Sequence, residues 1–501
     1  LLANLILLIL CLITLFQYNK EILSLLKDVK TTAFSWEGCL YLGILILIAF
    51  FTSRGPIHAD TNMYHAQAIR WYEEYGVVKG LANLQWHFAY NSSYFGLAAI
   101  FSMAFLGGQS LHTTTGFIAA ALCIWALHHL KDFFNHKRHI ADMCCMGILL
   151  YALVNITGSV SPASDYATMF LSLYLIARWA EEIESEPKDI TTYCLLSIFA
   201  VFIFTLKLSA GLLVLLVIYP AVFLIKEKRI KEIVTYLTLG ILTLLPFLIR
   251  NVIISGWLLY PFPALDLFSV DWKLPVQYVN IDSAQIKVWA RCLYDPKLID
   301  TPFLEWLPIW WSSQERYAQM LILTNLLALA LDGIIVLHVL LQKKQINWNL
   351  VLLNTVTILS AVAWLFLAAF IRYGLAFLLA IPMLAVGMWM KKEKSSFYKL
   401  LSGCIVVLMF FVLTPYWDHY FTDDLVFIKQ NLTEPYYIMQ KDYDHSDMQT
   451  FDMNGITIFN PKEGEVTGYQ YFPASSYDYM INCTELRGDR IEEGFRNTEF
   501  Q

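Results

Sequence analysis

The sequence predicts a polytopic, all-α membrane protein with a small α/β or β domain after its last helix. Two observations lead to this prediction. Of the 501 residues, 57% are hydrophobic and only 15% are charged, whereas soluble domains average roughly 25% charged residues. The mean hydropathy of the chain is +0.53. The sequence has no glycine-rich phosphate-binding loop, which argues against a pump driven by nucleoside triphosphates.

Twelve apolar runs are long enough to cross a bilayer, for which about 20 residues are needed and roughly 17–25 are tolerated. They occupy residues 1–17, 36–53, 112–130, 140–157, 165–181, 190–206, 209–225, 232–252, 318–341, 349–369, 374–390 and 397–414. No cleavable signal peptide is visible, and the chain opens at Leu1 inside an apolar run, which fits a natural start further upstream. A further apolar run, 92–106, is short.

The basic residues of the loops decide whether 92–106 spans the membrane. If it does not, one side receives nearly all the basic residues of the short loops: Lys20, Lys27, Lys30, Lys131, Lys137, Arg138, Lys188, Lys226, Lys228, Arg229, Lys231, Lys343, Lys344, Lys391, Lys392 and Lys394. This is the positive-inside pattern of cytoplasmic loops. We therefore expect 92–106 to be a juxtamembrane helix in the outer interface, and both ends of the chain to lie outside.

This topology divides the chain into a transmembrane module, residues 1–414, and an extracytoplasmic C-terminal domain, residues 415–501. Two large outer loops interrupt the module. The first covers residues 54–111. The second covers residues 253–317 and is rich in Trp, Tyr and Pro, so we expect short helices and irregular segments at the membrane surface.

The tail and the second outer loop carry two smaller predictions. Asn454-Gly455 separates two alternating runs, which is typical of a β-hairpin. Cys292 and Cys483 both fall on the outer side, so they are candidates for a disulfide bond or for two free thiols.

Ionisable side chains gather at the predicted outer face. They belong to the first outer loop, to outer helix ends and to outer turns: His58, Asp60, His65, Arg70, Asp165, Arg250, Lys207 and Arg372. Such residues are costly near membrane depth and are functional candidates by default. An acidic loop that faces isolated cations suits a phosphorylated substrate, because Arg and Lys bind phosphate and a carboxylate transfers protons.

Each of these residues also has an ordinary structural explanation. Lys207 could snorkel to the interface, and Arg250 or Arg372 could bond carbonyl oxygens at a helix end. Asp165 and Asp60 could cap the helices that follow them. Their grouping is the stronger argument, since chance would scatter them over both faces.

The two histidines of the first outer loop have no recognised metal-ligand spacing relative to Asp60, and ordinary loop positions explain them. A divalent metal ion is the cofactor left open. Asp60 and His58 would be its ligands, with several waters retained. His65 would help to position a substrate.

With these residues in place, the chain resembles the GT-C superfamily of polytopic glycosyltransferases, which use polyprenyl-phosphate-linked sugars. The hallmark of that superfamily is an acid in the first large outer loop, at the start of a juxtamembrane helix, and Asp60 stands there. Asp60-Thr-Asn-Met-Tyr64…Arg70 is similar to the Asp-Glu-x-x-Tyr…Arg pattern of bacterial aminoarabinose and mannosyl transferases. The chain departs from that pattern at Thr61, where those enzymes often carry a second acid. This puts a two-carboxylate metal site in doubt.

The resemblance continues over most of residues 36–390. Asp165 corresponds to an acid at an outer helix start, and Thr205-Leu-Lys207 to a Thr-Lys turn. The stretch from Leu245 to Asn251, which includes Arg250, is similar to a helix end with Arg-Asn, and Arg372-Tyr373 with Pro382 is similar to a late Arg/Lys-x-x-Pro segment. The tail looks like that of uncharacterised multi-pass proteins of Bacteroidota-type bacteria.

The resemblance implies a GT-C-like fold and an inverting glycosyltransferase. Asp60 would be the general base that takes a proton from the acceptor hydroxyl as it attacks the anomeric carbon. The other site residues would bind the donor phosphate (Arg372, Lys207, Arg250) or position the substrates and the loop (Tyr64, Arg70, Asp165, His65).

The implied partners are a polyprenyl-phosphate sugar donor, an acceptor that is an envelope glycan or lipid, and membrane lipids, with no nucleic acid. The implied location is a bacterial inner membrane, with the active site and the tail outside. Three alternatives stay open. A glycan polymerase or ligase would use outer cations without needing the early acid, a flippase would place polar residues nearer the midplane, and a receptor would display the tail.

Overall fold

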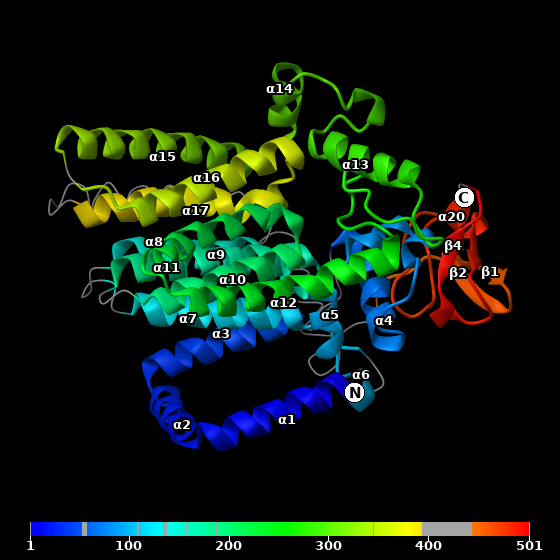
Figure 1. Cartoon of the computed structure of the whole chain (residues 1–501), viewed down its shortest axis with the longest axis horizontal. Coiled ribbons are helices and arrows are strands. Elements are labelled where there is room, and N and C mark those ends of the chain that lie inside the picture. Colours follow the sequence, from blue (N-terminus) through cyan, green and yellow to red (C-terminus); the bar gives the residue numbers. More distant parts are fainter. Residues whose placement is uncertain are drawn as a thin grey trace.

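The computed structural model describes residues 2–52, 58–107, 110–131, 133, 138–156, 158–185, 189–343, 345–392 and 443–499. The chain is mostly helical. The helices of the bundle are α3 (Trp36–Thr52), α7 (Thr114–Leu130), α8 (His139–Val154), α9 (Ser164–Glu184), α10 (Ile190–Leu206), α11 (Ile218–Lys226), α12 (Ile230–Ser255), α15 (Arg316–Leu341), α16 (Trp348–Leu367) and α17 (Ile371–Lys392). Before them come α1 (Leu2–Gln17) and α2 (Asn19–Ala33), and α1, which has no buried residue, lies apart from the bundle (Figure 1).

Shorter elements lie beyond one end of this bundle. From the first outer loop come a π-helical turn η1 (Thr61–His65), α4 (Ala66–Glu74), η2 (Leu81–Asn83), η3 (Trp86–Tyr90), α5 (Ser93–Ile100) and α6 (Ala104–Gly107). From the second outer loop come α13 (Val276–Ala290), η6 (Pro296–Leu298) and α14 (Phe303–Ser313). From the tail come β1 (Met448–Met453), β2 (Ile456–Pro461), α20 (Asp478–Asn482), β3 (Thr484–Leu486), η7 (Ile491–Glu493) and β4 (Phe495–Asn497).

Successive long helices from α7 onward run in opposite directions, so their connections alternate between the two ends of the bundle (Figure 1). We call the end that carries α4, α13 and the tail the capped end. The described parts of the predicted outer loops belong to this end, and the described basic residues of the connections, such as Lys131, Lys228 and Lys343, belong to the other. At that other end, the Glu184 carboxylate of α9 accepts the N–H groups of Ile140 and Ala141 (3.0 and 3.1 Å) and so caps the start of α8.

Five helical segments of the described residues are long and apolar enough to cross a membrane: Leu208–Lys226, Ile230–Ser255, Arg316–Leu337, Trp348–Leu367 and Ile371–Met390. The pair α1 and α2 would add one if it formed a single span, but it bends by 88°. Helices α3, α7, α8 and α10 are apolar but shorter, and the expected span 397–414 lies outside the described residues. The number twelve therefore remains a prediction.

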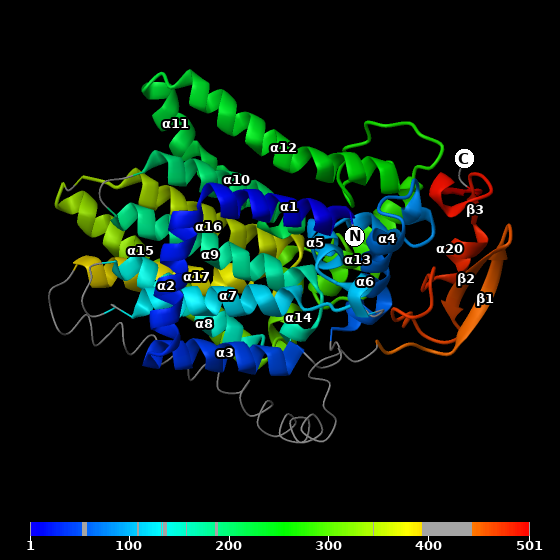
Figure 2. The same ribbon diagram turned by 90° about the horizontal axis from the view of Figure 1, so that it is seen from below.

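The run 92–106 also counts among the shorter apolar helices, as Ser93–Leu106, and its geometry favours the interfacial placement predicted for it. Its main helix, α5, has eight residues, which corresponds to about 12 Å at the usual rise, against the roughly 30 Å of a hydrocarbon core. The backbone then breaks, with Met103 at a φ of 52°, before the four residues of α6. The same short run lies at the capped end, beside α4 (Figure 2).

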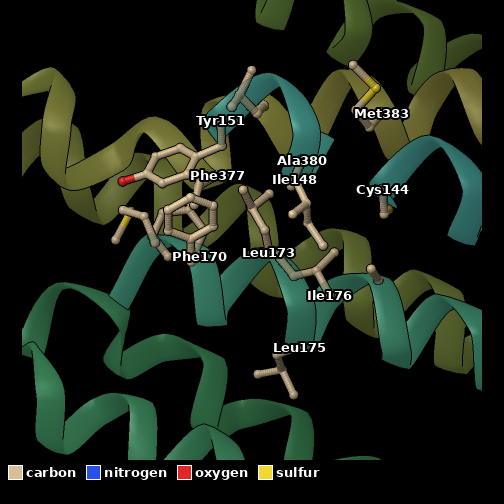
Figure 3. Close-up of a cluster of buried hydrophobic side chains, with 14 of the residues drawn as sticks. Cys144, Ile148, Tyr151, Phe170, Leu173, Leu175, Ile176, Phe377, Ala380 and Met383 are labelled. Carbon is tan, nitrogen blue, oxygen red and sulfur yellow. The ribbon is translucent and has the colours of Figure 1, made fainter. Parts of the chain in front are cut away.

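Helix α17 lies at the centre of the bundle. It packs against α8, α9, α15 and α16, and its side chains interdigitate with those of α8 and α9 (Figure 3). This part of the core contains Cys144, Ile148, Tyr151, Phe170, Leu173, Ile176, Phe377, Ala380 and Met383, all at most 2% exposed. Because α17 is fixed by four neighbours, its first residues are a rigid platform at the capped end.

The described part of the tail, residues 443–499, does not form a core of its own. Its two antiparallel sheets, β1–β2 and β3–β4, have two strands each, and its Ile458, Leu486 and Phe495 share a buried cluster with Trp71 of α4. The described tail and the first outer loop thus form one body, where the sequence suggested a separate domain.

The predicted hairpin is confirmed. Met453 pairs with Ile456, and the intervening Asn454 and Gly455 have positive φ values of 53° and 83°, as a tight hairpin turn requires. Cys292 and Cys483 are both free thiols, so the disulfide considered from the sequence does not form.

Candidate functional site

Asp60 stands at the capped end, directly before the π-helical turn η1. Single π-turns are rare in proteins as a whole, but many of those that occur lie at functional sites. They widen the helix and change the direction of its side chains. The chain just before Asp60 is held in place by the His58 N–H, which donates to Ser161 Oγ (3.1 Å) in the connection between α8 and α9. The backbone just before Asp60 is therefore tied to the bundle.

Three helix ends bring charged side chains to Asp60. Asp165 is the second residue of α9, Lys207 follows the last residue of α10, and Arg372 is the second residue of α17. The sequence predicted this grouping, and the structure brings all three residues together with Asp60. Asp165 does not cap its helix, since the N-cap position is Ala163.

Arg372 connects the two acids. Its Nη2 lies 3.3 Å from Asp60 Oδ2, and its Nε lies 3.2 Å from Asp165 Oδ2. Lys207 Nζ donates to the other oxygen of Asp165. The side chain of Asp165 is only 5% exposed, whereas those of Asp60 and Arg372 are 29% and 37% exposed. Asp60 and Arg372 are therefore accessible from solvent, whereas Asp165 is buried and pairs with both cations.

The charges around Asp60 keep it ionised. Burial acts to raise the pKa of the Asp60 carboxyl, but the neighbouring His58 and Arg372 lower it more, and the net pKa lies below the usual value. Burial likewise lowers the pKa of His58, against the opposing effect of Asp60 and Asp165. At neutral pH the site thus holds two carboxylates, two cations and an uncharged imidazole, and an ionised Asp60 can accept a proton.

The geometry does not favour a metal ion bound between Asp60 and His58. His58 Nδ1 lies 3.9 Å from Asp60 Oδ2, and that same oxygen faces Arg372. Within the described part of the chain, no group of three His, Cys, Asp or Glu side chains is placed to hold a metal ion.

Tyr64 and His65 form the wall behind Asp60. His65 is 3% exposed, and its Nδ1 lies 3.1 Å from Thr61 Oγ1 within the π-turn. Burial lowers the pKa of His65 to about 3, so the ring is uncharged. Tyr64 stacks on the ring of His87 with centroids 4.8 Å apart. These contacts stabilise the π-turn. A role of Tyr64 and His65 in positioning a substrate remains a prediction.

Lys207 has a second contact that the sequence analysis did not name. Its ammonium group lies 3.6 Å from the ring centroid of Tyr373, the residue after Arg372, and Tyr373 Oη accepts from Arg372 Nη2 (3.2 Å). An aromatic ring under one cation and beside another holds both in place.

Two of the predicted site residues have other partners. Arg250 Nη1 donates to the carbonyl of Gly76 (2.5 Å), and its guanidinium lies 3.6 Å from the ring centroid of Tyr72. Among the described residues it pairs with neither acid, so its grouping with Arg372 and Lys207 as a phosphate ligand is not supported by the geometry. Arg70 donates to two carbonyl groups of the tail, as described below. Both arginines fasten the first outer loop.

A family assignment covers most of these residues. Residues 1–379 match the family described as "Domain of unknown function (DUF8201)". The chain belongs to this family. The part that matches the DUF8201 family includes Asp60, Asp165, Lys207 and Arg372, and it ends within α17, before the tail. No curated protein and no solved structure matches the chain.

The tail contributes to the site in a way that the sequence did not indicate. Burial and the charge of Asp60 raise the pKa of Glu465, so this tail residue lies within electrostatic reach of the site. Contacts over such a separation in sequence leave no periodic or local signal, and a turn such as Lys462-Glu-Gly464-Glu465 has the composition of any exposed loop.

Proposed function

We propose that the chain is a membrane glycosyltransferase with a GT-C-like fold, which moves a sugar from a polyprenyl-phosphate donor to an acceptor outside a bacterial inner membrane. The observation that supports this most is the contact between Asp60 and Arg372. A carboxylate that a substrate can reach and a guanidinium that a phosphate can reach lie 3.3 Å apart, at the end of an apolar bundle.

In this proposal Asp60 is the general base. It takes the proton of the acceptor hydroxyl while the hydroxyl oxygen attacks the anomeric carbon, and the bond from that carbon to the donor phosphate breaks. A single displacement inverts the anomeric centre. The acceptor is an envelope glycan or lipid, and the prenyl chain of the donor lies among the membrane lipids beside the helices.

Arg372 and Lys207 stabilise the leaving phosphate, whose charge grows as the bond breaks. A guanidinium has five N–H donors. The contacts of Arg372 to Asp60, Asp165 and Tyr373 use Nε and Nη2, and Nη1 has no partner among the described residues, so its donors are available to a phosphate. Asp165 keeps both cations oriented without being reachable itself.

The test is Asp60→Asn in the purified full chain, assayed by mass spectrometry for sugar transfer from a panel of polyprenyl-phosphate sugars. We expect a loss of transfer of roughly a hundredfold or more, which is the usual contribution of a general base, with donor binding retained. Asp300→Asn is the control, because Asp300 is an exposed carboxylate of the second outer loop. Unchanged transfer in Asp60→Asn would remove Asp60 as the base.

A flippase would behave differently in the same preparation. It would move a lipid-linked glycan across vesicles without breaking the phosphate–sugar bond. A polymerase or ligase would transfer glycan yet tolerate Asp60→Asn.

A further inference from the structure

The turn that carries Asp60 depends on the tail for its hydrogen bonds. In a regular α-helix the N–H of Ala66 would donate to the carbonyl of Asn62, four residues back. Here Ala66 donates to Thr61, five residues back. Asn62 O instead accepts the N–H groups of Thr467 (3.0 Å) and Gly468 (2.9 Å). In the π-turn, Asn62 O loses the Ala66 N–H as its donor, and a segment about 400 residues further along the chain replaces it.

The next carbonyl of the turn is bound in the same way. Met63 O accepts from Thr467 Oγ1 (2.9 Å), and Ser476 Oγ lies 3.2 Å from the same oxygen. Ser476 Oγ also lies 2.8 Å from the carbonyl oxygen of Glu465. The two ends of the tail segment 465–476 are thus fastened at one point, directly over the turn.

The face of α4 beyond the turn is bound to the same segment. Gln67 Nε2 donates to the carbonyl groups of Gly468 (3.0 Å) and Tyr471 (2.7 Å). One turn further, Arg70 Nη1 donates to those of Tyr469 (2.7 Å) and Gln470 (2.8 Å). Charge-assisted bonds of this kind are about twice as strong as neutral ones. The tail therefore follows α4 from the turn to its last residues.

Without these bonds the π-turn has no reason to persist. An unsatisfied buried carbonyl costs roughly 1–3 kcal/mol, and Asn62 regains a donor most directly if the turn tightens to a regular α-helix. When a five-residue turn tightens to a four-residue turn, the backbone before the turn rotates by about 100° around the helix axis. Asp60 directly precedes the turn, so it would move away from Arg372.

We propose that the tail is a positioning element of the site: Thr467 and Gly468 hold the π-turn that presents Asp60 to Arg372. Thr467 is the positioning residue, because it supplies both its N–H and its hydroxyl to the turn. The effect on sugar transfer rests on the proposed function, whereas the effect on the turn does not.

The test compares Thr467→Val, Thr467→Ser and two glycine variants in the full chain. A Cβ at Gly468, whose φ is 65°, would lie 2.8 Å from the carbonyl oxygen of Asp444. Gly464 has a similar φ of 73° but no atom within 4 Å of its Cβ position. Gly464→Ala is therefore the control for the conformational cost alone, and Thr467→Ser restores the hydroxyl.

The first measurement is amide hydrogen exchange of residues 61–67, which requires no substrate. We expect Thr467→Val and Gly468→Ala to exchange roughly five- to tenfold faster, as the loss of about one hydrogen bond implies, and the two control variants to match the wild type. Unchanged exchange in both would overturn the proposal. If Gly468→Ala does not fold, Thr467→Val decides alone.

The second measurement is sugar transfer by the same variants. Faster exchange together with a lower kcat and an unaltered KM for the donor supports a positioning role, and Thr467→Ser should restore kcat. Faster exchange with unchanged transfer would refute the positioning role if Asp60→Asn abolishes transfer, and it would count against Asp60 as the base if Asp60→Asn also leaves transfer unchanged. The two failures are therefore distinguishable.

Discussion

The side-chain amide of Asn325 in α15 donates to the carbonyl oxygen of Leu378 in α17 (2.8 Å). Leu378 lies four residues before Pro382. Proline has no N–H, so it deprives the carbonyl four residues earlier of its helical partner. Asn325 replaces that partner, and it is 5% exposed. The proline of the central helix is thus compensated by a neighbouring helix.

This pairing predicts a coupled effect on stability. Asn325→Leu should destabilise the protein by about 1–2 kcal/mol, the range of polar bonds between helices in membranes. In a Pro382→Ala background, residue 382 regains its N–H, and Asn325→Leu should then cost less. A thermal-unfolding double-mutant cycle in detergent measures the coupling energy. If the two changes are simply additive, the compensation is refuted.

Substitution of Arg372 should weaken the binding of the sugar donor, whereas substitution of Arg250 should not. Arg372 contacts two acids through different nitrogens, and a lysine has a single charged nitrogen that cannot reproduce this. We expect Arg372→Lys to weaken the binding of a polyprenyl-phosphate sugar roughly tenfold, or about 1.4 kcal/mol, measured by titration into the purified protein.

Arg250→Lys is the matched variant. Because Arg250 contacts Gly76 and Tyr72, this substitution should lower the melting temperature and leave donor affinity unaltered. A loss of donor affinity in Arg250→Lys would return this residue to the phosphate site.

Asp282 of α13 predicts a pH dependence of stability. It is 2% exposed and accepts from Tyr90 Oη (2.7 Å). Burial raises the pKa of its carboxyl to about 6, although the hydroxyls of Tyr260 and Tyr90 act to lower it. A raised folded-state pKa means that the stabilising contribution is complete below about pH 4, the unfolded-state value. It is lost as the pH rises through about 6.

Asp282→Asn should therefore match the wild type at pH 4 and exceed it at pH 7.5. The two-unit difference in pKa corresponds to about 3 kcal/mol as an upper bound. Melting temperatures of both proteins over this pH range measure the effect, with Asp300→Asn as an exposed control. Equal wild-type and Asp282→Asn stability at both pH values would show that the carboxyl is not desolvated.

Part of the site was predictable because its signals are local. An acid after an apolar run, an acid at a helix start and cations at helix ends are readable in order, and the alternation of helices places Asp60, Asp165, Lys207 and Arg372 at one end. Each of these residues lies within two residues of a long helix or of η1. The alternating direction of successive helices is therefore enough to predict that these four residues lie at the same end of the bundle.

The functions of Arg70 and Arg250 were not predictable in the same way. The sequence predicts that Arg250 binds the donor phosphate, because an unpaired cation at an outer face suggests a phosphate, and that Arg70 positions the loop or a substrate. Their partners are mostly carbonyl groups and aromatic rings of distant segments, and every residue has a carbonyl group. The sequence therefore contains no feature that marks these acceptors. The π-turn after Asp60 has no sequence signature either, since it exists through bonds to the tail.

The order of synthesis gives the tail contact a further meaning. A chain emerges from the ribosome N-terminus first, so the helices up to Lys392 exist before Thr467 and Gly468 have been made. During that interval the turn at Asn62 lacks its donors, and the Asp60 carboxylate is not yet aimed. The helices of the bundle can therefore pack around α17 before the turn has its tail partners. If the tail holds the turn as proposed, Asp60 reaches its final position only after Thr467 and Gly468 have been translated.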